Sequence, residues 1–301
     1  MRSRSVSRGL PILVACALAV VALPRVALTV STCRWSDFDG SMTVEMDGAL
    51  TIERSGEVFL VDGAPCLGTG GTATVSTVQV VSVRDNSSGG RKITISLAGG
   101  PFAPGWETGP SPDLWFDLSS QGNQCNRVII VGSTGGDTIR WGRAGEFEYI
   151  NLNAAETADV DFDVRAAGTY HCIMALVFGG DGNDVVSGAG GLDTGLPANY
   201  SMRLEGGAGA DRLIGGNNRN TLAGGLGNDS LIGGRRADAL AGGNGADTLR
   251  GGFLGDVIKG GSGADTLIGG PDADVLVGGP GIDTCNGGSG KDEFWGCEKI
   301  I

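Results

Sequence analysis

The sequence predicts an all-β protein built from stacked short repeats, and three observations lead to this expectation. Glycine accounts for 56 of the 301 residues and proline for only 10, which excludes collagen and a proline-rich linker. In the C-terminal part, pairs of glycine recur every nine residues, and aspartate follows each pair at a constant distance. Upstream, segments such as 41–54 alternate apolar and polar residues, as half-buried strands do.

The nine-residue frame runs from 179 to 295 without insertion or deletion, as thirteen consecutive nonapeptides. Position 6 of the nonapeptide is aspartate in eleven units, and Met202 and Asn220 stand there in the other two. Position 8 is a large apolar residue, with Gly195 and Cys285 as exceptions. One apolar residue per unit cannot close a core alone, whereas stacked units build a continuous apolar column.

The pattern of glycine and aspartate indicates a cation site. Glycine at positions 1, 2 and 4 permits positive φ, and turns of that kind direct several backbone groups at one point. The carboxylate at position 6 adds a ligand for a hard divalent cation such as calcium, which takes about six to eight oxygens. An aspartate that only caps its own turn needs no nine-residue period, so the array favours the cation.

The units, among them GGAGADRLI, GGNGADTLR and GGSGADTLI, resemble the GGxGxDxUx nonapeptides of the hemolysin-type, or RTX, calcium-binding family. The resemblance implies a right-handed parallel β-roll, or β-solenoid, that holds several calcium ions in its turns. In a roll of this type two units form one rung. Turns eighteen residues apart therefore stack into two columns.

The two columns differ in their turns. Every turn of the first column has glycine at positions 1 and 4, so we expect the main calcium sites there. The five middle turns of the second column have lost the glycine at position 4, and Arg235 and Arg236 bring positive charge, so we expect little metal on that side. The residues at position 4 of those five turns are Tyr200, Asn218, Arg236, Leu254 and Asp272.

The candidate metal ligands follow from this comparison. Asp184 and Asp292 end well-formed turns of the second column and are candidate terminal sites. The first column contributes the aspartates Asp193, Asp211, Asp229, Asp247, Asp265 and Asp283, with the turn glycines Gly206, Gly209, Gly224, Gly227, Gly242, Gly245, Gly260, Gly263, Gly278 and Gly281. Because stacked carboxylates repel one another, we expect the repeat segment to fold only when calcium binds.

We expect four parts along the chain: a signal peptide at 1–30, a β-rich domain at 31–126, irregular solenoid rungs at 127–178 and the calcium-binding roll at 179–301. The region before the repeats is either a degenerate continuation of the solenoid or a separate small domain. Segment 132–140, GSTGGDTIR, matches the repeat two residues out of frame. Segments 72–83 and 91–100 flank a polar turn and are compatible with a β-hairpin.

The N-terminus and the cysteines predict export. Three arginines precede an apolar run at 10–23 that is too short to cross a bilayer comfortably, so we expect a secretory signal and no membrane span in the mature chain. Removing the signal leaves six cysteines, an even number that fits three disulfides. Proximity favours Cys33–Cys66 and Cys285–Cys297, which leaves Cys125–Cys172.

Other functions receive less support. The net charge of −12 argues against nucleic acid as a partner. The chain has one histidine, His171, and no HExxH motif, so we expect no enzyme but a secreted, extracellular protein with a structural or adhesive role. The alternative is a polysaccharide-active enzyme or a carbohydrate-binding protein. Aromatic and acidic residues at 106–117 would then contact a cell-surface or matrix polysaccharide, or else simply pack a loop onto the sheet.

Overall fold

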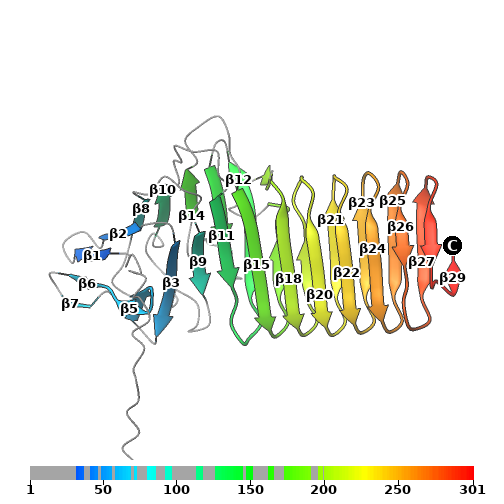
Figure 1. Cartoon of the computed structure of the whole chain (residues 1–301), viewed down its shortest axis with the longest axis horizontal. Helices are drawn as coiled ribbons and strands as arrows, with labels where there is room; N and C mark the ends of the chain where they lie inside the picture. The colour runs from blue at the N-terminus through cyan, green and yellow to red at the C-terminus, as the bar shows by residue number, and fades with distance from the viewer. Residues whose placement is uncertain are drawn as a thin grey trace, which may run out of the picture.

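The structure is a computed structural model that describes residues 32–36, 41–46, 49–55, 58–68, 71–72, 80–85, 92–96, 113–117, 126–144, 147–151, 162–165, 173–190, 196–198 and 200–301. Every regular element among these residues is a β-strand. The strands stack along the long axis of the molecule, with the C-terminus at one end of the stack (Figure 1). The all-β prediction is confirmed, and the repeats form a parallel β-roll.

Two sheets face each other across the roll, and each strand of the repeats pairs in parallel with the equivalent strand one rung away. We call them sheet A and sheet B. Sheet B runs without a break from the region before the repeats to the C-terminal end. Its parallel strands are β3 (Ala49–Ser55), β9 (Lys92–Ser96), β11 (Asn126–Val131), β15 (Ile173–Asp181), β18 (Met202–Ala208), β20 (Thr221–Leu226), β22 (Ala239–Asn244), β24 (Val257–Ser262), β26 (Val275–Val277) and β28 (Glu293–Trp295).

Sheet A contains two parallel runs that an antiparallel strand, β13 (Phe147–Asn151), connects. The upstream run comprises β2 (Ser41–Met46), β8 (Val80–Asp85), β10 (Asp113–Asp117) and β14 (Phe162–Arg165). The downstream run comprises β12 (Thr138–Ala144), β16 (Val185–Ser187), β19 (Arg212–Ile214), β21 (Ser230–Gly234), β23 (Thr248–Gly252), β25 (Thr266–Pro271), β27 (Thr284–Ser289) and β29 (Lys299–Ile300).

Short strands pair with the sheets in the N-terminal part of the molecule and, in the case of β17 (Leu196–Pro197), beside β12. The others are β1 (Thr32–Ser36), β4 (Val58–Val61), β5 (Ala64–Pro65), β6 (Leu67–Gly68) and β7 (Gly71–Thr72). The parallel stacking of β3, β9, β11 and β15 makes the described upstream strands a continuation of the solenoid. The boundaries proposed within 31–178 stay a prediction.

The core between the sheets becomes thinner toward the C-terminus. In sheet B the upstream strands β3, β9, β11 and β15 each bury two apolar residues, as Leu50 and Ile52 do in β3. In the regular repeats after β18 one apolar side chain per strand remains, because position 1, the next inward position, is glycine. The predicted column at position 8 is confirmed: Leu204, Leu222 and Leu240 lie in register and are at most 2% exposed.

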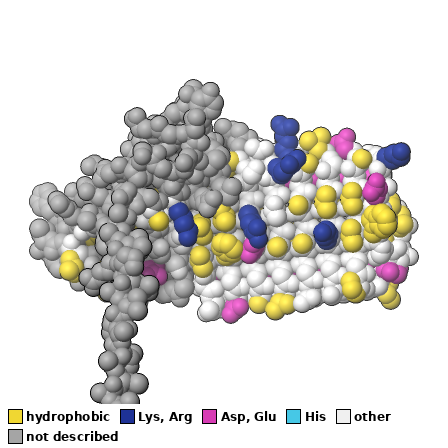
Figure 2. Space-filling view, in the orientation of Figure 1, with side chains coloured by type: hydrophobic (Ala, Val, Ile, Leu, Met, Phe, Trp, Pro, Cys, Tyr) yellow, Lys and Arg dark blue, Asp and Glu magenta, His cyan; other side chains and the backbone are white. Residues whose placement is uncertain are grey.

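The outer faces of the sheets repeat the same regularity. Because equivalent positions of successive units stack, apolar side chains form rows that run along the roll (Figure 2). Few acidic side chains are visible on that face. The aspartates of the repeats are mostly inside the turns.

Two expectations about the chain path are wrong. Segments 72–83 and 91–100 do not form a hairpin, because β8 lies in sheet A between β2 and β10 whereas β9 lies in sheet B between β3 and β11. The chain therefore passes from sheet A to sheet B between β8 and β9.

The second wrong expectation is that all thirteen units stack evenly. Between β16 and β18 the described residues leave the regular rung, because β17 pairs antiparallel with β12; we call this stretch the detour. Tyr200, expected in a turn, is buried against Trp141, whose indole N–H donates to the Tyr200 hydroxyl. Met202, expected at the end of a turn, is buried in β18 beside Ala175.

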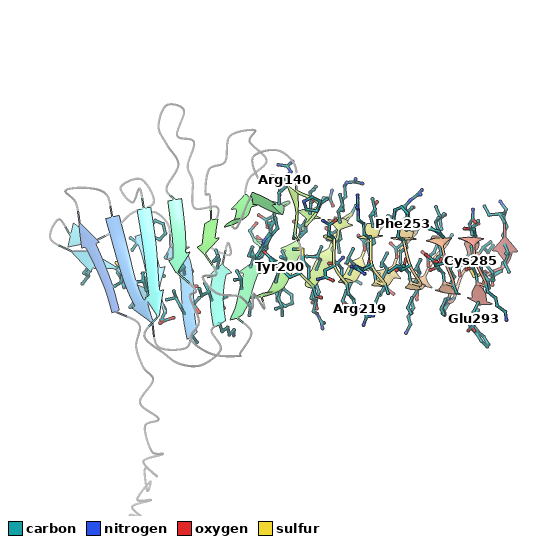
Figure 3. All side chains as sticks on the ribbon, turned by 90° about the horizontal axis from the view of Figure 1, so that it is seen from above. Arg140, Tyr200, Arg219, Phe253, Cys285 and Glu293 are labelled. Atoms are coloured by element: carbon teal, nitrogen blue, oxygen red, sulfur yellow. A yellow bond between two sulfur atoms is a disulfide. The ribbon has the colours of Figure 1, made fainter. Side chains whose placement is uncertain are left out.

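Two of the three proposed disulfides join described residues. Cys33 pairs with Cys66, and Cys285 pairs with Cys297, as the sequence predicts. In Figure 3 the roll is seen from above, with Cys285 labelled between the two sheets close to the C-terminal end. Its disulfide holds the last rung to the core column. Cys125, Cys172, His171 and the signal segment lie outside the described residues.

Candidate metal centre

The aspartates at position 6 form a ladder along each edge of the roll. The backbone N–H of Asp211 donates to Asp229 Oδ1 one rung away at 2.8 Å, and the N–H of Asp229 donates to Asp247 Oδ1 at the same distance. We name the edges by their aspartates. The first edge contains Asp184, Asp211, Asp229, Asp247, Asp265 and Asp283, and the second edge contains Asp238, Asp256, Asp274 and Asp292.

In all of these aspartates except Asp292, the second carboxylate oxygen is buried and has no hydrogen-bond partner. Such an unpartnered buried acceptor costs about 1–3 kcal/mol, and more when it carries charge. A single case would be a local defect, whereas nine in register indicate that a missing positive group belongs there. The nine atoms are Oδ2 of Asp184, Asp211, Asp229, Asp238, Asp247, Asp256, Asp265, Asp274 and Asp283.

Glycine at position 1 leaves room beside this oxygen. A Cβ atom added to Gly206 would lie 2.2 Å from Asp211 Oδ2 and 2.7 Å from the carbonyl oxygen of Gly224 in the next rung. The same pair of oxygens faces Gly224, where the distances are 2.2 Å to Asp229 Oδ2 and 2.6 Å to the Gly242 carbonyl. A carboxylate oxygen and a carbonyl oxygen therefore converge on the space that each glycine leaves open.

Burial raises the pKa of these carboxyls, because the charged form loses its hydration. The pKa of Asp256 rises to about 7, although the backbone N–H of Asp238 opposes the shift, and the charges of Asp238 and Asp274 add to it. Burial likewise raises the pKa of Asp184, Asp238 and Asp247 to about 6. Without a cation, neutral pH favours ionisation of these carboxyls although the fold excludes water from them.

This predicts an inverted pH dependence for the metal-free protein. A carboxyl whose pKa is higher in the folded chain binds more protons folded than unfolded between its ordinary value of 3.8 and about 7. Stability should therefore fall as the pH rises through that window. We expect the chain, stripped of divalent ions on a chelating resin, to melt at a lower temperature at about pH 8 than at about pH 5.

Saturating calcium should reverse this trend, because the ion competes with the proton for the same oxygens. Thermal unfolding followed by circular dichroism at both pH values, with and without calcium, measures all four cases. A melting temperature of the metal-free protein that rises with pH would contradict the raised pKa of these buried carboxyls.

The donor set fits a hard cation such as calcium, which prefers carboxylate and carbonyl oxygens. Within the described part of the chain, no three side chains of His, Cys, Asp or Glu meet at one point. A bound ion would therefore combine the aspartate oxygens with backbone carbonyls of neighbouring turns. Its two charges would offset the repulsion within the ladder and complete the coordination of Oδ2.

The structure brings most of the sequence-predicted residues together on the first edge, but it moves one of them. Asp184 was assigned to the second column, and this is wrong: the Asp184 N–H donates to Asp211 Oδ1 on the first edge, 27 residues away. The chain between β16 and β18 is longer by the nine residues that separate this spacing of 27 from the regular spacing of 18. Asp193 lies outside the described residues, and Asp292 stands on the second edge as expected.

The first edge has a regular turn backbone. In each first-edge turn before the last one, the N–H of glycine at position 4 donates to the position 3 carbonyl of the next turn, as Gly245 does to Ser262 at 2.8 Å. Gly245 has φ of 134°, and a Cβ atom there would lie 1.9 Å from the carbonyl oxygen of Gly227. Position 4 of the first edge therefore admits only glycine.

The second edge keeps the aspartates but changes the rest of the turn. Leu254 and Asp272 take position 4 with φ of 68° and 80°, a conformation that L-residues rarely adopt. The Leu254 N–H donates to the Asp272 carboxylate instead of a carbonyl. Arg235 and Arg236 are exposed. The two edges thus differ in the backbone of the turn at position 4, whereas their buried carboxylates at position 6 are alike.

Sequence reasoning missed several residues of the ladders. It set aside Asp238, Asp256 and Asp274 because of their neighbours at position 4, although each buries Oδ2 as the first-edge aspartates do. At the C-terminal end the Asp283 N–H donates to Glu298 Oε2, which stands where the next aspartate would be. No repeat pattern marks Glu298, so only the fold reveals it.

The comparisons with known proteins agree with this geometry. The family model of the RTX calcium-binding nonapeptide repeat matches four times, at residues 176–194, 203–231, 224–258 and 254–285. The interval between the first two copies falls on the detour near β17. No curated protein and no solved structure matches the chain. Residues 176–285 of this chain are therefore RTX calcium-binding nonapeptide repeats.

Proposed function

We propose that this chain is an exported protein whose repeat segment binds several calcium ions along both edges of the roll and folds on binding them outside the cell. The nine buried Oδ2 atoms without a partner carry the proposal. They lie at equivalent points of successive turns, so each rung can share ions with the next. An intracellular chain would meet little free calcium, and the repeats would stay unfolded until export.

Two further observations support export. The disulfides Cys33–Cys66 and Cys285–Cys297 are typical of an oxidising compartment, and the predicted secretory signal precedes them in the sequence. Among the described residues no helix is long and apolar enough to cross a bilayer. The proposed location is the cell exterior.

The proposed role is structural or adhesive rather than enzymatic. A roll of stacked strands is a stiff rod with long flat faces, which suits a matrix or surface component. The side chains nominated for polysaccharide contact at 106–117 lie outside those the structure describes, so a glycan-binding or glycan-cleaving function stays a prediction. Screening the calcium-loaded chain on a glycan array and in a reducing-sugar assay distinguishes these roles.

Isothermal titration of the metal-free full chain with calcium tests the central claim. We expect a large heat of binding, with several ions per chain, accompanied by a gain of β-sheet signal in circular dichroism. A titration without heat would refute calcium binding. Heat without a change in β-sheet content would refute folding on binding and leave a preformed calcium site.

A further inference from the structure

Asn220 stands where the other turns of the two ladders have aspartate. It ends the turn 215–220, the first regular turn of the second edge, and it is buried. Its backbone N–H donates to Asp238 Oδ1 at 2.6 Å, so it takes part in the ladder as an aspartate does. The difference lies in its side chain, which ends in an NH₂ group instead of a second oxygen. Arg219, the preceding residue, is labelled in Figure 3.

The amide nitrogen of Asn220 is surrounded by oxygen atoms. It donates to the Asn218 carbonyl at 2.6 Å and to Asp238 Oδ1 at 3.1 Å. The carbonyl oxygens of Gly216 and Gly233 lie at 3.3 Å each. Four acceptors from two successive turns thus point at one atom, which is the arrangement that a cation would require.

The amide nitrogen occupies the place that Oδ2 has in the aspartate turns. A Cβ atom added to Gly215 would lie 2.5 Å from Asn220 Nδ2 and 2.2 Å from the Gly233 carbonyl oxygen. The corresponding distances at Gly233 are 2.6 Å to Asp238 Oδ2 and 2.5 Å to the Gly251 carbonyl oxygen. The Asn220 amide donates to the surrounding oxygens, whereas Asp238 Oδ2 at the equivalent point has no donor.

The first edge begins in a comparable way. Its ladder starts at Asp137, whose N–H donates to Asp184 Oδ1 at 2.7 Å. Unlike the aspartates after it, Asp137 has partners for Oδ2, because the Ser133 N–H donates to it at 2.6 Å and the Ser133 hydroxyl at 3.0 Å. At the N-terminal end of both edges, donors of the chain itself take up the oxygens.

We propose that the side-chain amide of Asn220 replaces a calcium ion in the turn 215–220, so that the calcium array of the second edge begins at the following turn. Ser133 performs the equivalent task for Asp137 on the first edge. The inference rests on the proposed binding of calcium by the repeats. It makes the N-terminal end of each ladder independent of metal and gives the calcium-dependent rungs a preformed end on which to stack.

The substitution Asn220→Asp tests this directly in the full chain. It exchanges the NH₂ group for an oxygen at the same point, so the turn should lose its internal donor and acquire the donor set of its neighbours. We expect isothermal titration and native mass spectrometry to find one calcium ion more per chain than in the wild type. At neutral pH, the variant should also need a higher calcium concentration than the wild type to reach half of its full β-sheet signal.

Asn228→Asp is the matched control. Asn228 lies in a turn of the first edge, is exposed, and accepts the Ala246 N–H at 2.8 Å through Oδ1, a bond that aspartate retains. The charge change is the same, but the side chain lies outside the ring of oxygens. We expect its calcium stoichiometry to equal that of the wild type.

The reciprocal variant, Asp256→Asn, guards against a failure of Asn220→Asp to fold. It should bind at least one ion fewer and resist chelator better than the wild type, because the amide supplies the missing donor. An unchanged stoichiometry in both Asn220→Asp and Asp256→Asn would overturn the inference, as would an equal gain in Asn228→Asp. A wild type that binds no calcium at all would instead refute the proposed function.

Discussion

Removing calcium from the full chain at neutral pH is expected to unfold the rungs between 224 and 283 while β3, β9 and β11 stay folded. Each nonapeptide buries one large apolar side chain, which contributes about 1.5–3 kcal/mol. Each also places a charged carboxylate in a dry turn beside another one rung away. Adjacent charges cost about 1 kcal/mol in water and about 4 kcal/mol near a protein surface. Without the ion the repulsion exceeds what the thin core supplies.

The upstream strands should respond differently, because they bury two apolar residues each, such as Ile93 and Ile95 in β9. Hydrogen exchange read by mass spectrometry resolves the two regions, and circular dichroism reports the total loss of β-sheet. Magnesium at the same concentration is the control, since it demands tight octahedral geometry and gives up its water reluctantly. Full protection of the repeats in chelator would contradict the coupling of folding to calcium.

Gly245→Ala is expected to destabilise the calcium-loaded chain by about 3 kcal/mol, a large value for one methyl group. The backbone at Gly245 has φ of 134°, which alanine avoids, and the new Cβ would lie 1.9 Å from the Gly227 carbonyl oxygen. Relief requires the two turns to separate. That movement breaks the hydrogen bond from Gly245 to Ser262 and pulls the oxygens of the neighbouring calcium sites apart.

Urea unfolding in saturating calcium measures the loss, and the midpoint of the calcium titration should rise with it. Gly135→Ala is the matched control, because a Cβ atom there meets nothing closer than Ser133 Oγ at 3.7 Å. We expect Gly135→Ala to leave both quantities nearly unchanged. If Gly245→Ala were equally harmless, the close stacking of first-edge turns would not exist.

Much of the candidate site was predictable because the repeat fixes local geometry. The apolar column at position 8, the glycine requirement of the first edge and the disulfide at Cys285 all follow from residue types at constant spacing, and the structure contains each. The prediction of a metal-poor second edge used position 4 and the charges of Arg235 and Arg236, and it stays a prediction. It did not include the burial of Asp256, which depends on positions 1 and 6 that this turn retains.

Other features depend on how many residues the chain uses for each half rung of the roll. The sequence period places a turn on the correct edge only while every unit advances the chain by half a rung. Between β16 and β18 the chain has nine residues more than this rule allows, since the ladder spacing there is 27 instead of 18. Asp184 therefore changes edge, although its own nonapeptide is regular. For the same reason the repeat spacing did not predict the pairing of Asp137 with Asp184, which are 47 residues apart.

The sequence by itself determined that the C-terminal part of this protein is a roll of RTX calcium-binding nonapeptide repeats, because glycine, aspartate and leucine recur there at a nine-residue spacing. Only the tertiary structure decided which aspartates share an edge and which turns supply their own donors. These depend on the direction of single oxygen and nitrogen atoms from successive rungs, as around Asn220, and such directions arise when the rungs meet in space.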